Sequence, residues 1–257
     1  MKKRNLSAAK RIHKFYLDKL KNPKIKKVYL EFERNLGSFN LAKFSIAVSG
    51  GIDSMALAFL AKCHSIKRKQ NHLYFTVDHK LRSTSTKEAI QTKKQLKKYG
   101  LNCNILTWTN NKTSSNFQAK AREKRYDLIF QKSLNKNVNL VLTAHQKNDL
   151  YENFFIRLLR GSGLKGLISL SKKTELQNVT ILRPLINQKK DDLVFISKKV
   201  FDFYIKDPSN NNEKFQRVRI RKLLNGLKKD GFVFSLLNDI LLKKLEPYCR
   251  CHQRQRY

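Results

Sequence analysis

The chain of 257 residues has little glycine, proline, cysteine or acid, and no long apolar run. Its 9 glycines and 4 prolines exclude collagen-like and proline-rich linker proteins. The longest unbroken apolar run, Met55–Ala61, is far shorter than the ~18 residues that a membrane span needs. The basic start at Met1 is not followed by the apolar stretch of a secretory signal. We therefore expect a cytoplasmic protein, or one encoded by a plastid or mitochondrion, that does not enter a membrane.

Cysteine is also scarce. The four cysteines, Cys63, Cys103, Cys249 and Cys251, are too few and too scattered for a disulfide framework. Cys249 and Cys251 lie beside His252, but one tight cluster gives poor tetrahedral geometry for a metal. We expect free thiols in a reducing compartment.

Positive charge is what the chain has in excess. It carries 55 lysines and arginines against 19 acids, so its formal net charge is +36 and its pI is near 10.3. Nucleic acid is the expected partner, because each basic side chain on a phosphate releases a counterion. An anionic membrane is the competing partner, but no basic amphipathic anchor stands out. An AT-rich genome would explain much lysine and asparagine, but not so few acids.

The first 39 residues concentrate this charge, with twelve basic and three acidic side chains. Ile12, Phe15, Tyr16 and Leu20 recur at helical spacing, and a second helix is expected after Pro23. This segment is either a solvated cap on the core or an arm that faces RNA.

From Phe44 onward, short apolar segments alternate with longer helical ones. The expected strands are 44–48, 72–77, 103–108 and 139–144, and the expected helices are 55–62, 87–99, 116–134 and 149–159. This alternation predicts an α/β fold with a parallel sheet and helices on both faces. Ligands of such sheets bind at the carboxyl ends of the strands.

A glycine turn follows the first expected strand and precedes a helix. It reads Ser49, Gly50, Gly51, Ile52, Asp53, Ser54. The glycines allow a tight turn, and the helix start offers free N–H groups to an anion. Because a carboxylate beside a phosphate needs a cation between them, Asp53 is interpreted as a magnesium ligand. The turn lacks the Walker pattern. The alternative is a plain strand–turn–helix connection capped by Asp53 or Ser54.

This turn resembles the pyrophosphate loop of the PP-loop ATP pyrophosphatases, which have the adenine nucleotide alpha hydrolase-like fold. Six further segments, in order, resemble the tRNA(Ile)-lysidine synthetase family. They are Val77–Arg82, Asn116–Tyr126, Thr143–Glu152, Arg160–Leu167, Arg183–Leu185 and Asp207–Arg221. Together the seven motifs cover about Ser45 to Arg221. The chain departs from the family at Lys80, Asn148, Asn153 and Val218, which stand for the usual Gly, Asp, Thr and Asn.

The resemblance implies an ATP-dependent ligase with ATP and Mg²⁺ as cofactors. Its substrates would be L-lysine and the isoleucine tRNA with a CAU anticodon. The wobble cytidine would first be adenylated, and lysine would then displace AMP to give lysidine. Decoding would change from AUG to AUA.

The resemblance also assigns roles to residues. ATP would be bound by Ser49, Gly50, Gly51, Ile52, Asp53 and Ser54 with Asp78 and His79; catalysis would involve Asp53, Arg122, Arg125, Asp149 and Glu152; RNA would contact Arg160, Arg183, Arg217, Arg219 and Arg221. Arg122 and Arg125, like Asp149 and Glu152, are three apart and would share a helix face. Each set has an ordinary alternative: a turn cap for Asp78, a hydrogen-bonded structural histidine for His79, a solvated face for the arginines, and compensation of a helix dipole for the two acids.

Three parts are expected. Residues 1–39 form a basic helical extension, residues 40–222 the PP-loop catalytic domain, and residues 223–257 a short helical tail. The C-terminal tRNA-binding domains of many relatives are expected to be missing. Residues 1–39 and 214–229 would then supply phosphate contacts.

Two other functions remain open from the sequence. The first is another PP-loop tRNA-modifying enzyme such as a thiolase, although sulfur transfer needs paired or cluster-binding cysteines. The second is a non-catalytic basic RNA-binding protein with a decayed nucleotide site, which Asn148 and the short C-terminus would fit.

Overall fold

The computed structural model describes residues 7–80, 83–108, 117–167, 170–207 and 212–231, with side chains throughout these ranges except at 117–122 and 164–165. The chain divides into two compact units. The first unit is Met1–Gln146 with Lys173–Lys206, and the second is Lys147–Lys172 with Asp207–Tyr257. Within the described ranges, no helix has the length and apolar character to cross a membrane.

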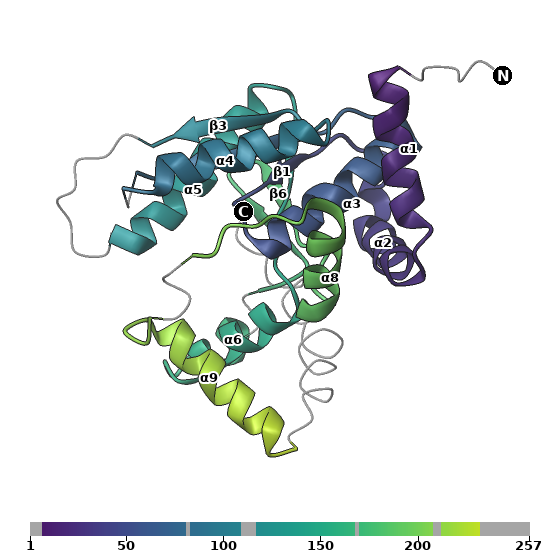
Figure 1. The fold of residues 1–257 in the computed structure, drawn as a ribbon. Helices are drawn as coiled ribbons and strands as arrows, with labels where there is room; N and C mark the ends of the chain where they lie inside the picture. Colours follow the sequence, from purple (N-terminus) through teal and green to yellow (C-terminus); the bar gives the residue numbers. More distant parts are fainter. Residues whose placement is uncertain (1–6, 81–82, 109–116, 168–169, 208–211, 232–257) are drawn as a thin grey trace. The chain divides into compact units, whose positions relative to one another are not determined.

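The first unit is built on a six-stranded sheet in the order β3-β2-β1-β4-β6-β5 (Figure 1). The strands are β1 (Ser45–Ala47), β2 (Leu73–Asp78), β3 (Cys103–Thr107), β4 (Leu140–Leu142), β5 (Lys173–Leu176) and β6 (Val179–Leu182). All neighbours are parallel except β5 and β6. The four expected strands are adjacent and parallel, as predicted.

Helices lie on both faces of the sheet in this unit. They are α1 (Ala8–Leu20), α2 (Pro23–Leu36), α3 (Ile52–Arg68), α4 (Ser85–Lys98), α5 (Phe117–Leu134) and α8 (Lys190–Phe201), with a 3₁₀ turn η1 (Gly37–Phe39). Strand residues alternate between two apolar clusters because successive side chains point to opposite faces. Ile46 and Tyr74 join the cluster beneath α1, α2, α3, α4 and α8, whereas Phe75 packs against Ile129 and Phe130 of α5. The expected fold class is therefore confirmed.

The helices α1 and α2 are part of this core. Tyr16 and Phe32 are fully buried in the same cluster as the sheet. The side chain of Asn22 caps the start of α2, where Pro23 is the first residue. The basic segment expected at the N-terminus thus forms one wall of the main core, and its lysines lie on the outer side.

The structure contains a hairpin, β5–β6, that was not among the strands expected from the sequence. Its two-residue turn, Gln177-Asn178, has positive φ at both positions, 50° and 60°. Such a turn matches the twist of a hairpin, but its usual signal is Asn-Gly. Because this turn has no glycine, it could not be predicted from the sequence.

The second unit contains three described helices: α6 (Lys147–Leu158), α7 (Leu164–Leu167) and α9 (Gln216–Lys229). The helix expected at 149–159 is confirmed, shifted by two residues at its start. Arg217 to Arg221 lies within α9, and Val218 and Ile220 are buried. Cys249 and Cys251 lie outside the described residues.

Candidate active site

The turn between β1 and α3 is organised by its two serines. The Ser49 main-chain N–H donates to Ser54 Oγ at 3.1 Å, and Ser54 Oγ donates to the Gly51 carbonyl at 2.8 Å. The two hydroxyl oxygens are 3.1 Å apart. Ser49 is exposed, whereas Ser54 is buried. These contacts fix the loop Ser49–Ser54 on the carboxyl side of β1, where the sequence places a ligand site.

Gly50 is required by the geometry of this loop. Its φ is +82°, and a Cβ atom there would lie 2.3 Å from Thr92 Oγ1 and 2.9 Å from Ile205 Cγ1. Its carbonyl accepts the N–H of Ile205 at 2.9 Å. Any other residue would therefore push α4 and the segment after α8 away from the loop.

The N-terminus of α3 is not capped by a side chain. Its N-cap residue is Gly51, which has no side chain that could accept a main-chain N–H of the first turn. The main-chain N–H groups of the first turn and the positive end of the helix dipole are thus directed at the loop. This combination of a glycine turn and a helix start can hold a phosphate group.

Asp53 lies in that first turn and pairs with Lys190. The two carboxylate oxygens lie 2.8 and 2.7 Å from Lys190 Nζ. Lys190 begins α8, and its side chain is 37% exposed against 25% for Asp53. Sequence reasoning missed Lys190. A signal was present, because lysine in the first turn of a helix opposes the dipole and calls for a nearby anion.

The donor set fits a magnesium ion held with a nucleotide. Among the described residues, no group of three His, Cys, Asp or Glu side chains could hold a metal ion. Magnesium in nucleotide enzymes usually takes one or two carboxylates and completes its shell with phosphates and water. Asp53 beside an open helix N-terminus offers that arrangement.

Asp78 is buried at the end of β2, with 2% exposure. Its Oδ1 accepts the N–H of Lys80 at 3.0 Å, and its Oδ2 accepts the Thr86 hydroxyl at 2.7 Å. The carboxylate thus ties the strand end to the start of α4, as a turn cap does. Lys80 has φ +50°, which explains why the family's usual residue here is glycine. Its neighbour His79 is half-buried.

The predicted arginines Arg122 and Arg125 lie on α5. The side chain of Arg122 lies outside the described residues. Arg125 is half-buried, with its guanidinium carbon 5.5 Å from the Tyr126 ring centroid. Arg183 is 5% exposed in the first unit, and its Nη1 donates to Thr174 Oγ1 at 2.8 Å on the β5 strand.

In the second unit, Asp149 and Glu152 of α6 meet two arginines of α9. Arg217 Nη2 donates to Asp149 Oδ1 at 2.7 Å, and Arg217 Nε to Glu152 Oε2 at 2.6 Å. Arg221 Nε donates to Glu152 Oε1 at 2.7 Å and its Nη2 to Oε2 at 3.2 Å. This hydrogen bond to Glu152 raises the pKa of Arg221. We call these four side chains the α6–α9 charge cluster.

The cluster matches the shared helix face that the sequence predicts for the two acids. The sequence did not indicate that two of the expected RNA-binding arginines would bind these acids. Arg160 and Arg219 are exposed: Arg160 Nη2 donates to Gln216 Oε1 at 3.0 Å, and Arg219 Nη1 to the Glu213 carbonyl at 2.8 Å.

A mostly parallel sheet whose first strand leads through a two-glycine loop into an open helix N-terminus defines an α/β protein with a phosphate-binding site. Residues 21–227 match the family model of the PP-loop domain, and the chain belongs to that family.

Relatives and folds agree with this assignment. The chain is 40% identical over 203 residues to the tRNA(Ile)-lysidine synthase of Orientia tsutsugamushi (strain Boryong), covering 78% of this chain and 46% of that protein. It is 37% identical over 188 residues to that of Bradyrhizobium diazoefficiens, covering 72% and 52%. The chain spans about half the length of these curated relatives. A U34-tRNA thiolase from Methanococcus maripaludis has the same fold, with a TM-score of 0.73, 17% identity and coverage of 88% and 80%.

Proposed function

We propose that this chain carries the catalytic part of a tRNA(Ile)-lysidine synthase, which joins L-lysine to the wobble cytidine of isoleucine tRNA with ATP. The observation that carries the proposal is the loop Ser49–Ser54 with Asp53 and Lys190, in a chain 40% identical to a protein of that name. The relatives that carry the lysidine synthase name are longer than this chain, which matches about half of each of them. The action of this chain on tRNA and lysine is therefore part of the proposal.

The first step is adenylation of the cytidine. The carbonyl oxygen on C2 of the base attacks the α-phosphorus of ATP, and pyrophosphate leaves with the electrons of the broken P–O bond. The loop Ser49–Ser54 and the N-terminus of α3 would hold the departing phosphates. Asp53 would hold a magnesium ion, which supplies charge neutralisation to those phosphates when bound. Lys190, released from Asp53, would add a second positive charge.

The second step joins lysine to the base. The ε-ammonium group first gives one proton to solvent; the neutral ε-amine then attacks C2, the bond from C2 to the bridging oxygen breaks, and AMP leaves with that oxygen. The amine loses its remaining extra proton as the product forms. We assign the α6–α9 charge cluster to lysine. Free lysine carries charges of both signs, and Asp149 and Glu152 match its ammonium groups while Arg217 and Arg221 match its carboxylate.

The described cysteines argue against sulfur transfer as the alternative. Cys63 and Cys103 are both buried. Burial raises the pKa of Cys103 to about 12 and that of Cys63 well above its usual value. Neither thiol supplies the accessible thiolate that a persulfide carrier needs. The likeness to the thiolase concerns the fold alone.

The experiment is tRNA-dependent exchange of labelled pyrophosphate into ATP in the absence of lysine. Two transcripts of the isoleucine tRNA are compared, one with C34 and one with U34. We expect exchange with C34 and none with U34, and its loss in Asp53→Asn. Exchange with U34 alone would favour a thiolase-like enzyme. Absence of exchange with either transcript, from a chain that binds both, would favour a non-catalytic RNA-binding protein.

A further inference from the structure

Three helix segments of the first unit meet at a place that the proposed site does not use. Tyr16 Oη on α1 donates to the carbonyl of Tyr99, directly after α4, at 3.0 Å. The Tyr99 ring packs edge-on against Phe201, the last residue of α8, with centroids 4.9 Å apart. Lys19 Nζ on α1 donates to the Lys199 carbonyl at 2.8 Å. The body of α1 and the C-terminal ends of α4 and α8 therefore form one packed junction.

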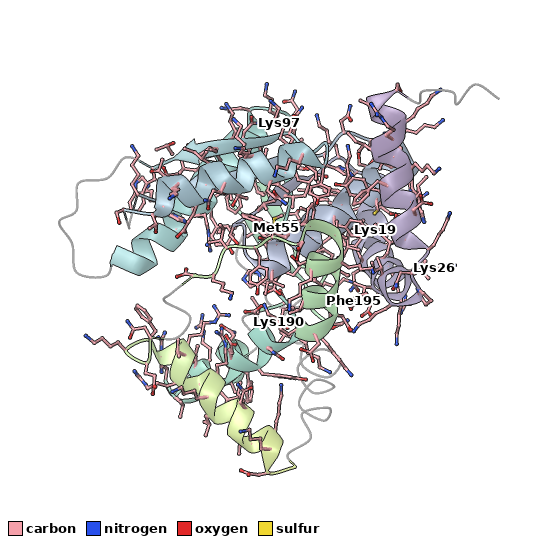
Figure 2. All side chains as sticks on the ribbon, viewed as in Figure 1. Lys19, Lys26, Met55, Lys97, Lys190 and Phe195 are labelled. Atoms are coloured by element: carbon pink, nitrogen blue, oxygen red, sulfur yellow. The ribbon has the colours of Figure 1, made fainter. Side chains whose placement is uncertain are left out.

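The outer side of this junction is basic. Its exposed side chains are Arg11, Lys14, Lys94, Lys97, Lys98, Lys198 and Lys199. We call these seven residues the α1–α4–α8 basic surface. Figure 2 labels Lys97 of α4, which is one of these seven residues, and Lys19 of α1, whose side chain contacts the main chain of Lys199. Three segments far apart in the sequence thus bring their bases together only in the folded unit.

Few acids offset this charge. Asp18 on α1 is paired with Lys21 at 2.7 Å, and Asp202 is exposed just after α8. Within the described ranges, Arg11, Lys97, Lys98, Lys198 and Lys199 form no ion pair. Basic residues in the last turns of α4 and α8 offset each helix dipole, which accounts for single lysines but not for three helices converging. The repulsion between them calls for a polyanion outside the protein.

The basic surface is made of other residues than the loop Ser49–Ser54. Lys190 at the start of α8 contacts Asp53 of the loop, and Lys198 and Lys199 follow it by about 12 to 14 Å along the helix at ~1.5 Å per residue. On α4, Thr92 is the residue that packs against Gly50, and Lys97 and Lys98 lie farther along the same helix.

We infer that the α1–α4–α8 basic surface binds the phosphate backbone of RNA, through residues other than those of the loop Ser49–Ser54. Seven exposed lysine and arginine side chains on three adjoining helices suit repeated phosphates. A membrane would need several apolar side chains among them, and the large apolar side chains exposed on the described residues of α1, α4 and α8 are Leu17 and Ile90. That the RNA is tRNA rests on the proposed function.

The test is a charge-matched pair of variants of the full chain. The surface variant replaces Lys97, Lys98, Lys198 and Lys199 with Gln. Its folding should be preserved, because the hydrogen bond from Lys19 reaches the main chain of Lys199. The control variant replaces Lys26, Lys27, Lys132 and Lys136 with Gln. These lysines are equally exposed but lie on α2 and at the end of α5. Both variants lose four charges, and thermal melting verifies that both are folded.

Affinity for isoleucine tRNA is measured across a salt series for both. We expect the surface variant to bind about tenfold or more weakly at low salt, with a log–log salt slope reduced by about three, since each phosphate contact contributes ~0.9. The control should change little. Equal losses in the two variants would overturn the inference, because net charge alone would then explain binding. Unchanged RNA binding with lost binding to phosphatidylserine vesicles would assign the surface to a membrane. Pyrophosphate exchange by the wild-type chain reports the proposed function independently.

Discussion

Asp53 and Lys190 show how the loop balances charge before a nucleotide binds. A carboxylate in the first turn of α3 favours the helix dipole but repels phosphates. The ammonium of Lys190 bridges both carboxylate oxygens and neutralises this repulsion. Because the pair is about a third exposed, it contributes little to stability. We interpret the pair as part of a phosphate-binding site. When a nucleotide binds, Asp53 would release Lys190 and hold the magnesium ion, and Lys190 would contact a phosphate.

The first prediction compares Lys190 with its exposed neighbour Lys189. Lys190→Gln should lower the kcat/KM for ATP in pyrophosphate exchange by about 100-fold, the scale of a lost electrostatic contact to a leaving group. Lys189→Gln should leave it unchanged. Asp53→Asn should lose exchange while tRNA binding is retained. In the double variant the losses should not add, because the two groups act as a unit. Equal activity of Lys190→Gln and Lys189→Gln would contradict the role of Lys190.

A second residue-scale feature is a buried pair of histidines beneath α3. His64 Nδ1 lies 3.0 Å from His72 Nε2, and His64 Nε2 lies 2.9 Å from the Asn40 carbonyl. The His72 ring stacks on Phe44 at 3.5 Å between centroids. Burial, with the neighbouring His64, Lys62 and Lys43, lowers the pKa of His72 to about 3, and burial lowers that of His64. Both rings are therefore neutral in the folded protein at pH 7.

This pair predicts loss of stability in acid. The pKa of His72 is about 3 when folded and ~6.5 when unfolded, so the unfolded state binds the proton first. The contribution of neutral His72 to the free energy of unfolding is complete above pH ~6.5 and is lost as the pH falls toward 3. Between pH 7 and pH 5 the loss is about 2 kcal/mol. Urea unfolding at pH 7 and pH 5 measures it. His72→Gln, which keeps a donor for His64, should show a smaller drop between the two pH values. An equal drop in the variant would assign the acid sensitivity to other groups.

At the scale of elements, the α6–α9 charge cluster holds two helices of the second unit together. Glu152 is nearly buried, with 3% side-chain exposure, whereas Asp149 is 18% exposed. A buried carboxylate pairs favourably only when its partners surround it, and removing one side leaves uncompensated charge. Within the cluster, Glu152 therefore has mainly a structural role, whereas Asp149 is more accessible to a ligand.

Substitution of each acid in turn separates the structural role from the binding role. Glu152→Gln should lower the free energy of unfolding by about 3 kcal/mol, and Asp149→Asn by about 1 kcal/mol. Asp149→Asn should also raise the KM for lysine far more than the KM for ATP, because in the proposed function Asp149 would bind an ammonium group of lysine. Denaturant unfolding and two-substrate kinetics measure both effects. Glu213→Gln, an exposed acid paired with Lys222, is the control and should stay within about 0.5 kcal/mol. Equal changes in the two KM values would remove lysine from the cluster.

The elements that the sequence predicted were those with a local signal. The alternating strands and helices, and the loop between β1 and α3, follow from apolar runs and from two adjacent glycines. The hairpin β5–β6 was missed because Gln177 and Asn178 adopt positive φ without glycine. The start of α3 at Ile52 was placed three residues too late, since its first turn carries Asp53 and Ser54 rather than apolar residues.

The partners of site residues were beyond prediction because they come from distant segments. Lys190 is 137 positions from Asp53, and Arg217 is 68 positions from Asp149. No local periodicity joins such residues; only the packing of α8 beside α3, and of α9 beside α6, brings them together. The sequence motif indicates where a phosphate would bind, and the tertiary structure places Lys190 beside Asp53 at that loop.

At the scale of the whole molecule, part of the net charge of +36 is carried by α1, a helix that also builds the core. Tyr16 on α1 is buried against Phe59, with ring centroids 5.4 Å apart. Deleting α1 would therefore uncover the core as well as remove bases, and substitution of surface lysines is the cleaner experiment. In α1, the basic and the buried side chains belong to one helix, so a deletion cannot remove the first without the second.

Lysidine is the product that the proposed function requires, and its formation on tRNA can be measured. The chain is incubated with ATP, isotopically labelled lysine and an unmodified isoleucine tRNA transcript with a CAU anticodon. The tRNA is then digested to nucleosides for mass spectrometry. We expect the label in a modified cytidine from position 34, dependent on ATP and absent with Asp53→Asn. Pyrophosphate exchange without label in any nucleoside would contradict the account, because the adenylated base would then be meant for another nucleophile.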